Sequence, residues 1–103
     1  MKEVQQIIML EKDIERRLVN GVRALGGRAY KFVSPGNIGV PDRLVVLPGG
    51  RVIFVELKTE RGKLSPMQKV QLRQLSELGA KAVVLRGVDG VEQFFEEVKN
   101  NEI

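Results

Sequence analysis

The feature that most constrains the fold is a pair of apolar runs joined by a glycine-rich turn. Residues 43–47 (RLVVL) and 52–57 (VIFVEL) flank the tetrapeptide Pro48-Gly49-Gly50-Arg51. Two glycines between such runs are a strong signal for a β-hairpin. Because both runs are apolar at odd and even positions alike, we expect central strands that are covered on both faces. The chain should therefore contain a sheet with a layer packed on each side.

Helical segments on either side of the hairpin predict an α/β fold. A helix is expected over residues 7–25, ending at Gly26-Gly27, and the capping box Ser65-Pro66-Met67-Gln68 opens another that ends near residue 78. The remaining elements are a strand at 28–33, a strand at 81–85, a turn at 86–90 and a helix at 91–99. The order is helix, three strands, helix, strand, helix, so a helical crossover makes the last two strands parallel. We expect one domain spanning residues 1–103, with a core over about 7–99 and a small mixed sheet sandwiched by helices.

Composition narrows the chemistry that such a domain can perform. The 103 residues include no cysteine and no histidine, which excludes disulfides, thiolate sites, Ser-His triads and histidine-ligated zinc. A bound metal would need oxygen ligands, which suits Mg²⁺, Mn²⁺ or Ca²⁺. Seventeen Lys and Arg against 13 Asp and Glu give a net charge of +4, which favours a polyanionic partner such as nucleic acid. No apolar run approaches the ~18 to 20 residues of a membrane span, so we expect a cytosolic protein.

Charged residues at the open end of the hairpin are the first candidates for a site. Asp42 precedes the first strand, while Glu56 and Lys58 lie two apart on the second strand and share a face, with Leu57 pointing into the core. If Leu47 were paired with Val52, Asp42 would face away from Glu56, and the two carboxylates converge only if the loop has an odd length or a bulge. Converging carboxylates favour a divalent cation between them, and the alternative is a salt-bridged strand end in a basic protein.

The first helix carries a residue that interrupts its apolar stripe. Glu11 projects into the middle of that stripe and Glu15 lies at its edge; the stripe consists of Ile7, Ile14, Leu18, Val22 and Leu25. A carboxylate facing a core is costly unless it is paired or bound to metal. Two interpretations are open: Glu11 is solvated because the first turn overhangs the core, or it points into a polar pocket against the sheet.

The loop Ser34-Pro35-Gly36-Asn37-Ile38-Gly39 also has two interpretations. Its glycines and asparagine allow the backbone to approach a ligand such as a phosphate group closely, and a plain connecting loop has the same composition.

Taken together, these segments resemble the PD-(D/E)xK nuclease superfamily and, more narrowly, the stand-alone VRR-NUC domain. Pro41-Asp42 matches the PD step and Glu56-Leu57-Lys58 the ExK step, and the resemblance extends from about residue 11 to 85. The other matching segments are Glu11-x-x-Ile14, Ser34-Pro35-Gly36, Gly39 to Arg43, Pro48-Gly49-Gly50 and Ser65-x-x-Gln68.

The resemblance implies a metal-dependent endonuclease acting on branched or structured DNA, such as the homodimeric Holliday-junction resolvases often encoded by phages. It implies that Glu11, Asp42, Glu56 and the Leu57 carbonyl hold Mg²⁺ (Mn²⁺ is the alternative), that Lys58 is catalytic, and that Gln68 lies near the site. Glu15 is the substitute if Glu11 is solvated. The expected location becomes the cytoplasm of a bacterium or a phage-infected host cell.

The same resemblance directs attention to basic residues as DNA contacts. The candidates are Lys58, Arg43, Arg61, Lys63 and Lys69, with Arg16, Arg17 and Lys31 as weaker ones; each alone is equally compatible with a solvated surface charge. Two other functions are carried forward: a non-catalytic DNA-binding scaffold, and a nuclease acting on other nucleic acids. The chain is short for an added base-reading domain, which argues against a sequence-specific enzyme.

Overall fold

A computed structural model describes the backbone of residues 2–103 and the side chains of residues 3, 5 and 10–103. The elements follow the predicted order; they are α1 (Lys2–Ala24), β1 (Arg28–Lys31), β2 (Arg43–Leu47), β3 (Arg51–Lys58), α2 (Pro66–Glu77), β4 (Lys81–Arg86) and α3 (Gly87–Lys99). The predicted place of Ile7 on the apolar stripe lies outside the described side chains. Within residues 2–103, no helix has the length and apolarity needed to span a membrane.

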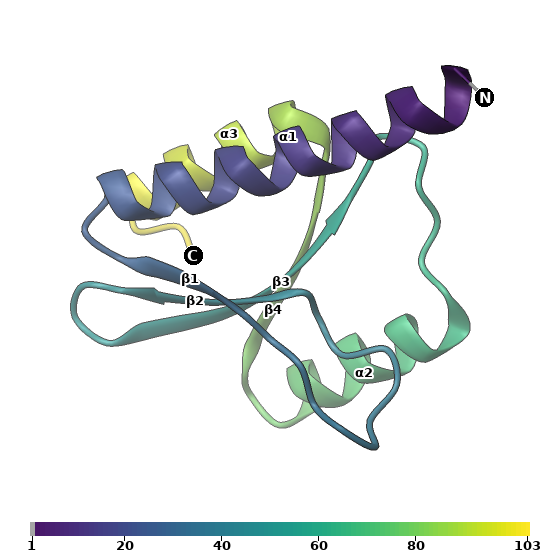
Figure 1. Cartoon of the computed structure of the whole chain (residues 1–103). Helices are drawn as coiled ribbons and strands as arrows, with labels where there is room; N and C mark the ends of the chain where they lie inside the picture. Colours follow the sequence, from purple (N-terminus) through teal and green to yellow (C-terminus); the bar gives the residue numbers. More distant parts are fainter. Residues whose placement is uncertain (1) are drawn as a thin grey trace.

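The four strands form one mixed sheet in the order β1-β2-β3-β4. The first three pair antiparallel, and β3 and β4 pair parallel, as the helical crossover requires. Helices α1 and α3 lie on one face of the sheet and α2 on the other (Figure 1). The α/β sandwich with a small mixed sheet is therefore confirmed.

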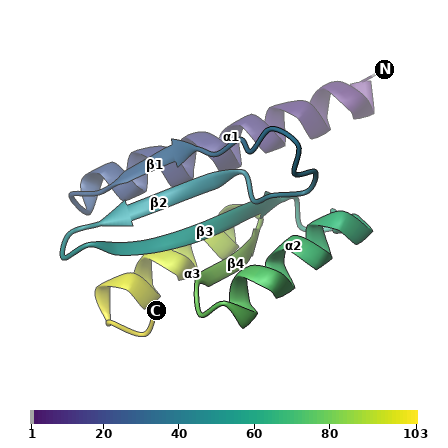
Figure 2. The same cartoon turned by 90° about the horizontal axis from the view of Figure 1, so that it is seen from below.

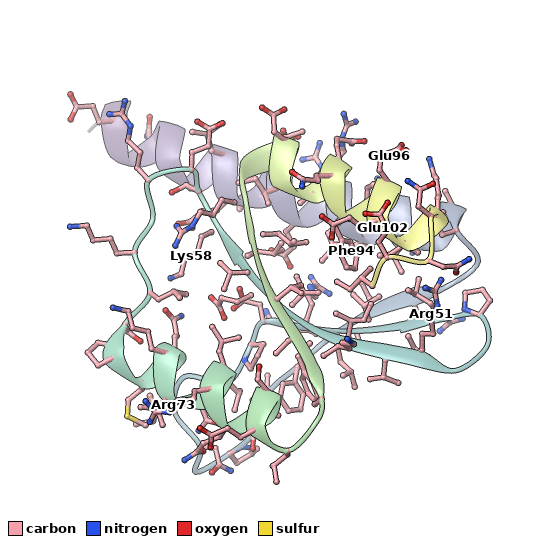
Figure 3. All side chains as sticks on the ribbon, turned by 180° about the vertical axis from the view of Figure 1, so that it is seen from behind. Arg51, Lys58, Arg73, Phe94, Glu96 and Glu102 are labelled. Atoms are coloured by element: carbon pink, nitrogen blue, oxygen red, sulfur yellow. The ribbon has the colours of Figure 1, made fainter. Side chains whose placement is uncertain are left out.

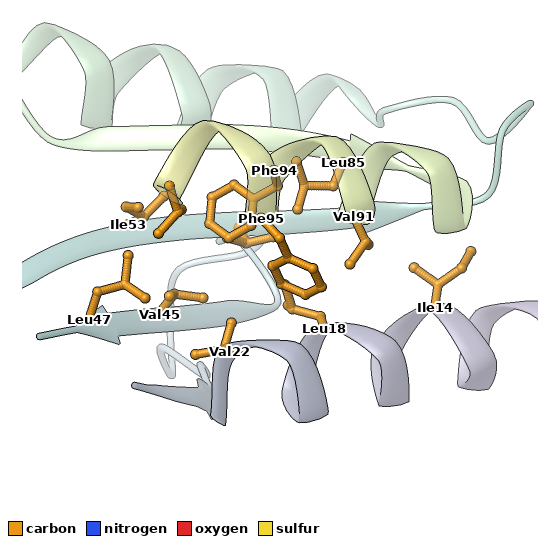
Figure 4. Packing of buried hydrophobic residues seen from close by; sticks show 12 residues of the cluster. Ile14, Leu18, Val22, Val45, Leu47, Ile53, Leu85, Val91, Phe94 and Phe95 are labelled. Carbon is orange, nitrogen blue, oxygen red and sulfur yellow. The ribbon is translucent and has the colours of Figure 1, made fainter. Parts of the chain in front are cut away.

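The core fills the space between the sheet and the pair α1 and α3. Its buried side chains are Ile14, Leu18, Val22, Val45, Leu47, Ile53, Val55, Leu85, Val91, Phe94, Phe95 and Val98. Figure 4 shows Phe94 and Phe95 of α3 between the strands and α1. A Cβ atom at Gly21 would lie 2.0 Å from the Phe95 ring, so this glycine allows the two helices to pack closely.

The opposite face of the sheet is less well covered than the sequence predicted. Helix α2 has no buried residue, and Val52 of β3 remains 43% exposed. The helix lies mainly against β4, at one side of the sheet (Figure 2). Part of the remaining cover comes from Phe32, whose ring stacks edge-on against Phe54 at a centroid distance of 5.5 Å. The prediction of two fully covered faces was thus wrong for the α2 side.

Two predicted boundaries also change. Strand β1 ends at Lys31 instead of residue 33, and α3 begins at Gly87, inside the segment expected to be a turn. Gly87 has a φ of +67°, a left-handed conformation that glycine adopts readily. The chain therefore turns at this single residue, and the helix starts earlier than the expected turn over residues 86–90 would allow.

The hairpin between β2 and β3 has a three-residue loop, which corrects the assumed pairing of Leu47 with Val52. Leu47 pairs with Arg51, and the Gly50 N–H donates to the Leu47 carbonyl at 3.1 Å. Gly49 and Gly50 have φ values of +84° and +79°, which side chains disfavour. The odd loop length shifts the register by one residue, which matters at the other end of the hairpin.

Candidate active site

The hairpin register places Asp42 and Glu56 on the same face of the sheet. The ladder ends with Arg43 paired to Val55, so the next position outward sets Asp42 opposite Glu56. The Phe32 N–H donates to the Asp42 carbonyl at 2.8 Å, and the Asp42 carboxylate accepts from the Leu57 N–H at 3.1 Å. Asp42 is therefore held on both sides, by its backbone and by its side chain. The geometric condition for convergence is met.

Glu56 is a carboxylate buried almost completely, with 2% of its surface exposed. Its Oε2 accepts from Gln68 Nε2 at 3.1 Å and lies 3.9 Å from Lys58 Nζ. Its Oε1 is buried and has no hydrogen-bond partner among the described residues. Burial raises the pKa of Glu56 from 4.5 to about 7; the nearby Asp42 carboxylate adds to the rise, against the opposing charge of Lys58.

Gln68 combines two roles that the sequence could only suggest. The side-chain oxygen of Gln68 accepts from the Ser65 backbone N–H at 2.8 Å, and the Gln68 backbone N–H donates to Ser65 Oγ at 3.1 Å. These two bonds complete the predicted capping box. Because the amide oxygen is held by Ser65, the amide nitrogen is directed at Glu56. The first turn of α2 thus fixes the orientation of the buried carboxylate.

These groups line one pocket of about 490 Å³ at the end of the sheet. The pocket is also lined by Glu11 and Glu15 of α1, by Lys31 at the end of β1 and Phe32 just after it, and by Lys63 of the loop that leads to α2. Figure 3 places Lys58 below α1, at the end of β3 opposite to Arg51. The α1 and α2 sides of the sheet therefore both contribute to one polar cavity.

The two helical carboxylates occupy different environments. Glu11 is exposed at the pocket rim, where the first turns of α1 project beyond the sheet, so each of its two interpretations is partly right (Figure 1). Glu15 is paired with the guanidinium of Arg43. Among the described residues no three carboxylates gather closely enough to form a metal cluster, and the preformed pair is Asp42 and Glu56.

Arg43 has a structural role that the sequence reading missed. Only 13% of its side chain is exposed, and besides the pair with Glu15 it donates to the Ala29 carbonyl at 3.1 Å. It joins α1, β1 and β2 beside the pocket, so in the free protein its guanidinium is held by protein partners. No local signal separated it from the other arginines, because its partners lie 14 and 28 residues away in the chain.

The remaining basic candidates fall into two groups. Arg61, Lys63 and Lys69 are exposed, and Lys31 and Lys63 line the pocket. Arg17 forms an ion pair with Glu92, and Arg16 is exposed on α1.

The glycine loop before Asp42 packs against protein. Gly39 has a φ of +90°, and a Cβ atom there would lie 2.6 Å from the Met67 carbonyl carbon. The Ile38 carbonyl also accepts from Gln71 Nε2 at 3.4 Å. The loop is therefore anchored on the first turns of α2, and buried Pro41 follows it into the sheet. This close contact explains the Gly39-Val40-Pro41-Asp42 segment without a phosphate.

The donor set of the pocket suits a divalent metal that prefers oxygen ligands. Glu56 offers a buried oxygen without a partner, and the adjacent Asp42 raises the cost of leaving both carboxylates charged. A cation between them would relieve both penalties. The oxygen atoms able to contribute are those of Asp42, Glu56 and the Leu57 carbonyl, with Glu11 at the rim.

Comparisons with known proteins agree with this geometry. The VRR-NUC domain family matches residues 4–89. A phage protein named "Putative nuclease p44", from Acyrthosiphon pisum secondary endosymbiont phage 1, is 50% identical over 82 residues, which cover 80% of this chain and 88% of that protein.

Solved structures extend the likeness to three dimensions. One described as a VRR_NUC domain superposes with a TM-score of 0.80 at 32% identity, covering 84% of this chain and 94% of its own. A second, a VRR_NUC domain protein, gives a TM-score of 0.63 at 20% identity over 85% and 86% of the two chains, a likeness of fold alone. With its buried Glu56, the facing Asp42 and the neighbouring Lys58, the chain belongs to the VRR-NUC family of nuclease domains.

Proposed function

We propose that this nuclease is a Mg²⁺-dependent, structure-selective DNA endonuclease that resolves Holliday junctions or other branched DNA as a homodimer, with Mn²⁺ as an alternative metal. The observation that carries the proposal is the unpartnered buried oxygen of Glu56 opposite Asp42. A structural ion pair would satisfy both of its oxygen atoms, whereas a metal site requires one to be left open.

The protein's own groups divide the work in this proposal. Asp42, Glu56 and the Leu57 carbonyl would hold the cation, with Glu11 as a further ligand from the rim. Bound there, the cation supplies Lewis-acid stabilisation of the phosphate and lowers the pKa of its water. The ammonium group of Lys58, 3.9 Å from Glu56, is placed to offset negative charge that develops on the phosphate. Gln68 keeps Glu56 oriented toward the cation.

The DNA substrate is supported by charge and by the position of the exposed cations. The chain carries a net charge of +4, Lys31 and Lys63 line the pocket, and the exposed Arg61 and Lys69 directly adjoin the lining residues Gly62 and Gln68 in the chain. Such cations neutralise phosphates without reading sequence, which suits an enzyme selective for DNA shape.

A homodimer follows from the geometry of the proposed reaction. The described part of one chain offers one such pocket, so one chain would cut one strand at a time. Symmetrical cleavage of a four-way junction needs two pockets related by a two-fold axis. Light scattering should give twice the mass of one chain at the concentration where cleavage is measured.

The direct test incubates purified protein with labelled four-way junction, flap, duplex and single-stranded DNA, in Mg²⁺, Mn²⁺ or EDTA. We expect cleavage of branched substrates that requires a divalent metal and is lost in Asp42→Ala and Glu56→Ala. Lys81→Ala, at the far edge of the sheet, is the matched control. Cleavage that persists in EDTA or in both variants would contradict the metal mechanism, and failure to cut any of the DNA substrates in either metal would contradict the DNA substrate.

A further inference from the structure

A second cavity lies between α1 and β1. It has a volume of about 490 Å³ and is lined by Val19 and Arg23 of α1 and by Gly27, Arg28, Ala29 and Tyr30. Neither arginine side chain has an ion pair or hydrogen bond within the described part of the chain. Half of Tyr30 is exposed (50%). By the strand register, Arg28 and Tyr30 pair with Val46 and Leu44 on the face of the sheet away from α1, so their side chains border the cavity at the open edge of β1, across from Arg23. The cavity therefore combines free positive charge with an available aromatic ring at this edge.

The two cavities follow one seam between α1 and β1. On α1, Glu15 lines the active-site pocket, while Val19 and Arg23, one and two turns further along the same side of the helix, line the second cavity. On the chain of β1, Lys31 and Phe32 line the first cavity and residues 28–30 the second. Strand β1 is an edge strand, so no further strand of this chain covers the seam.

The length and charge of the seam fit a nucleic-acid strand. From Glu15 to Arg23 the helix rises about 12 Å, and a strand of duplex DNA advances about 3.4 Å per nucleotide, so the seam spans about three nucleotides. Glu15 is the acidic group on this path, and its charge is met by Arg43. Repulsion of phosphates along the seam is correspondingly reduced.

We propose that the α1–β1 seam, defined by Arg23, Arg28 and Tyr30, binds the DNA strand that flanks the scissile phosphate. The two arginines contact backbone phosphates, and Tyr30 stacks on a base or sugar exposed at the branch point. The seam would thus hold the strand whose scissile phosphate reaches Asp42 and Glu56. This inference rests on the proposed endonuclease function for its substrate, but it concerns binding, which is measurable without cleavage.

The test measures binding in EDTA, in an Asp42→Asn background, with labelled four-way junction, duplex and single-stranded DNA. The double variant R23Q/R28Q is compared with R73Q/K81Q, which removes the same charge from α2 and the start of β4. We expect R23Q/R28Q to weaken junction binding about 10- to 100-fold and to lower the slope of log K against log salt by about 2. The control pair should change affinity by less than about 3-fold, since rim and surface charges contribute weakly.

The tyrosine is tested separately from the charges. Tyr30→Ala should weaken binding about 10-fold without altering the salt slope, because stacking releases no counterions, and Tyr30→Phe should bind like the parent protein. Photo-cross-linking from 5-iodouracil placed at each of the nucleotides that follow the branch should label a peptide containing Tyr30. Circular dichroism of every variant checks that the fold is retained.

Several outcomes would overturn the inference. If R23Q/R28Q and R73Q/K81Q weaken DNA binding equally, the seam contributes no more than any other surface charge. Cross-links found only in peptides without Tyr30 would show that the strand binds elsewhere. If Arg28 or Tyr30 variants convert a dimer to a monomer in light scattering, the seam is an interface between copies. If the protein binds DNA through the seam but cuts none of the substrates, only the endonuclease proposal is refuted. If it cuts DNA with a divalent metal but the seam variants bind DNA like the parent protein, only the seam proposal is refuted.

Discussion

Val55 and Glu56 are neighbours on β3 and equally buried, yet they lie on opposite faces of the sheet. Val55 is 0% exposed within the core under α1 and α3, and Glu56 is 2% exposed on the α2 side, next to Asp42. The first face contains the buried apolar side chains, while α2 adds no buried residue to the second. Neighbouring residues of one strand therefore serve different purposes: those facing α1 and α3 stabilise the fold, and those facing α2 form the candidate active site. One face is closely packed, and the other keeps a polar cavity open.

The largest expected effect comes from removing the charge on the polar face. Glu56→Gln should lower the rate of metal-dependent cleavage by at least about 10²- to 10³-fold, because a ligand that stabilises the transition state is lost. The same change should raise the free energy of unfolding by about 1 kcal/mol at neutral pH, since a buried charge with an unpaired oxygen disappears. Single-turnover cleavage and urea denaturation measure the two. A Glu56→Gln protein that is less stable would remove the contrast between the faces.

The opposite result is expected on the apolar face. Phe94→Ala, at a side chain only 1% exposed, should lower the free energy of unfolding by about 3–5 kcal/mol through lost burial and a cavity. Val52→Ala, on the α2 side and 43% exposed, is the control and should cost less than about 1 kcal/mol. Urea denaturation monitored by circular dichroism gives both values. Similar losses in the two variants would mean that the faces are packed alike.

A pH dependence of stability should report the buried carboxylate. Between pH 4.5 and about 7 the folded protein keeps the Glu56 proton that the unfolded chain has lost, because the folded pKa is raised to about 7. The folded state then binds more protons, so the contribution of Glu56 to stability falls as pH rises through this window, by on the order of 2–3 kcal/mol, and levels off above it. Unfolding in EDTA across this range should show the decline, and Glu56→Gln should lack it.

Divalent metal should reverse that decline. Metal binds the deprotonated carboxylates, so its apparent affinity should increase as pH rises toward and above about 7. Stabilisation by added Mg²⁺ should be larger at pH 8 than at pH 5.5 and absent in Glu56→Gln. Equal stabilisation at both pH values would place the cation elsewhere.

The smallest effect separates the two roles of Gln68. Gln68→Glu retains an acceptor for the Ser65 N–H but replaces the donor to Glu56 with a second carboxylate, so cleavage should fall about 10-fold and the facing carboxylates should lower stability by about 1 kcal/mol. Ser65→Ala removes the oxygen that caps Gln68 N–H and should cost about 1 kcal/mol of stability with cleavage within about 3-fold. Cleavage kinetics and urea denaturation distinguish them. If both variants lose activity in proportion to stability, Gln68 is a cap alone.

Much of the fold followed from local patterns. The seven elements, the capping box of α2 and the parallel pairing of β3 with β4 were all predicted, because periodicity and turn residues act over a few positions. The boundaries shifted where tertiary contacts decide, as at Gly87, where a left-handed residue replaced a longer turn. The family followed from the residues of the site and their spacing.

The contacts around the site were harder to predict, since they join distant segments. Arg43 was predicted only as a DNA contact, and the structure adds contacts with Glu15 and Ala29 that the sequence did not indicate. Gly39 was considered for a phosphate and instead lies against the backbone of Met67. In both cases the residue type was informative, but the partner was a neighbour only in space.

The sequence by itself determined that a Pro-Asp step and a Glu-x-Lys step return to the same end of one hairpin. Only the tertiary structure decided that Asp42 and Glu56 share a face, because a loop of three or four residues fits the same letters and a one-residue slip reverses every side chain. The left-handed Gly49 and Gly50 close the shorter loop and pair Leu47 with Arg51. That register also turns Val45, Ile53 and Val55 toward α1 and α3. Burial of the apolar face thus fixes the register that brings the two carboxylates together.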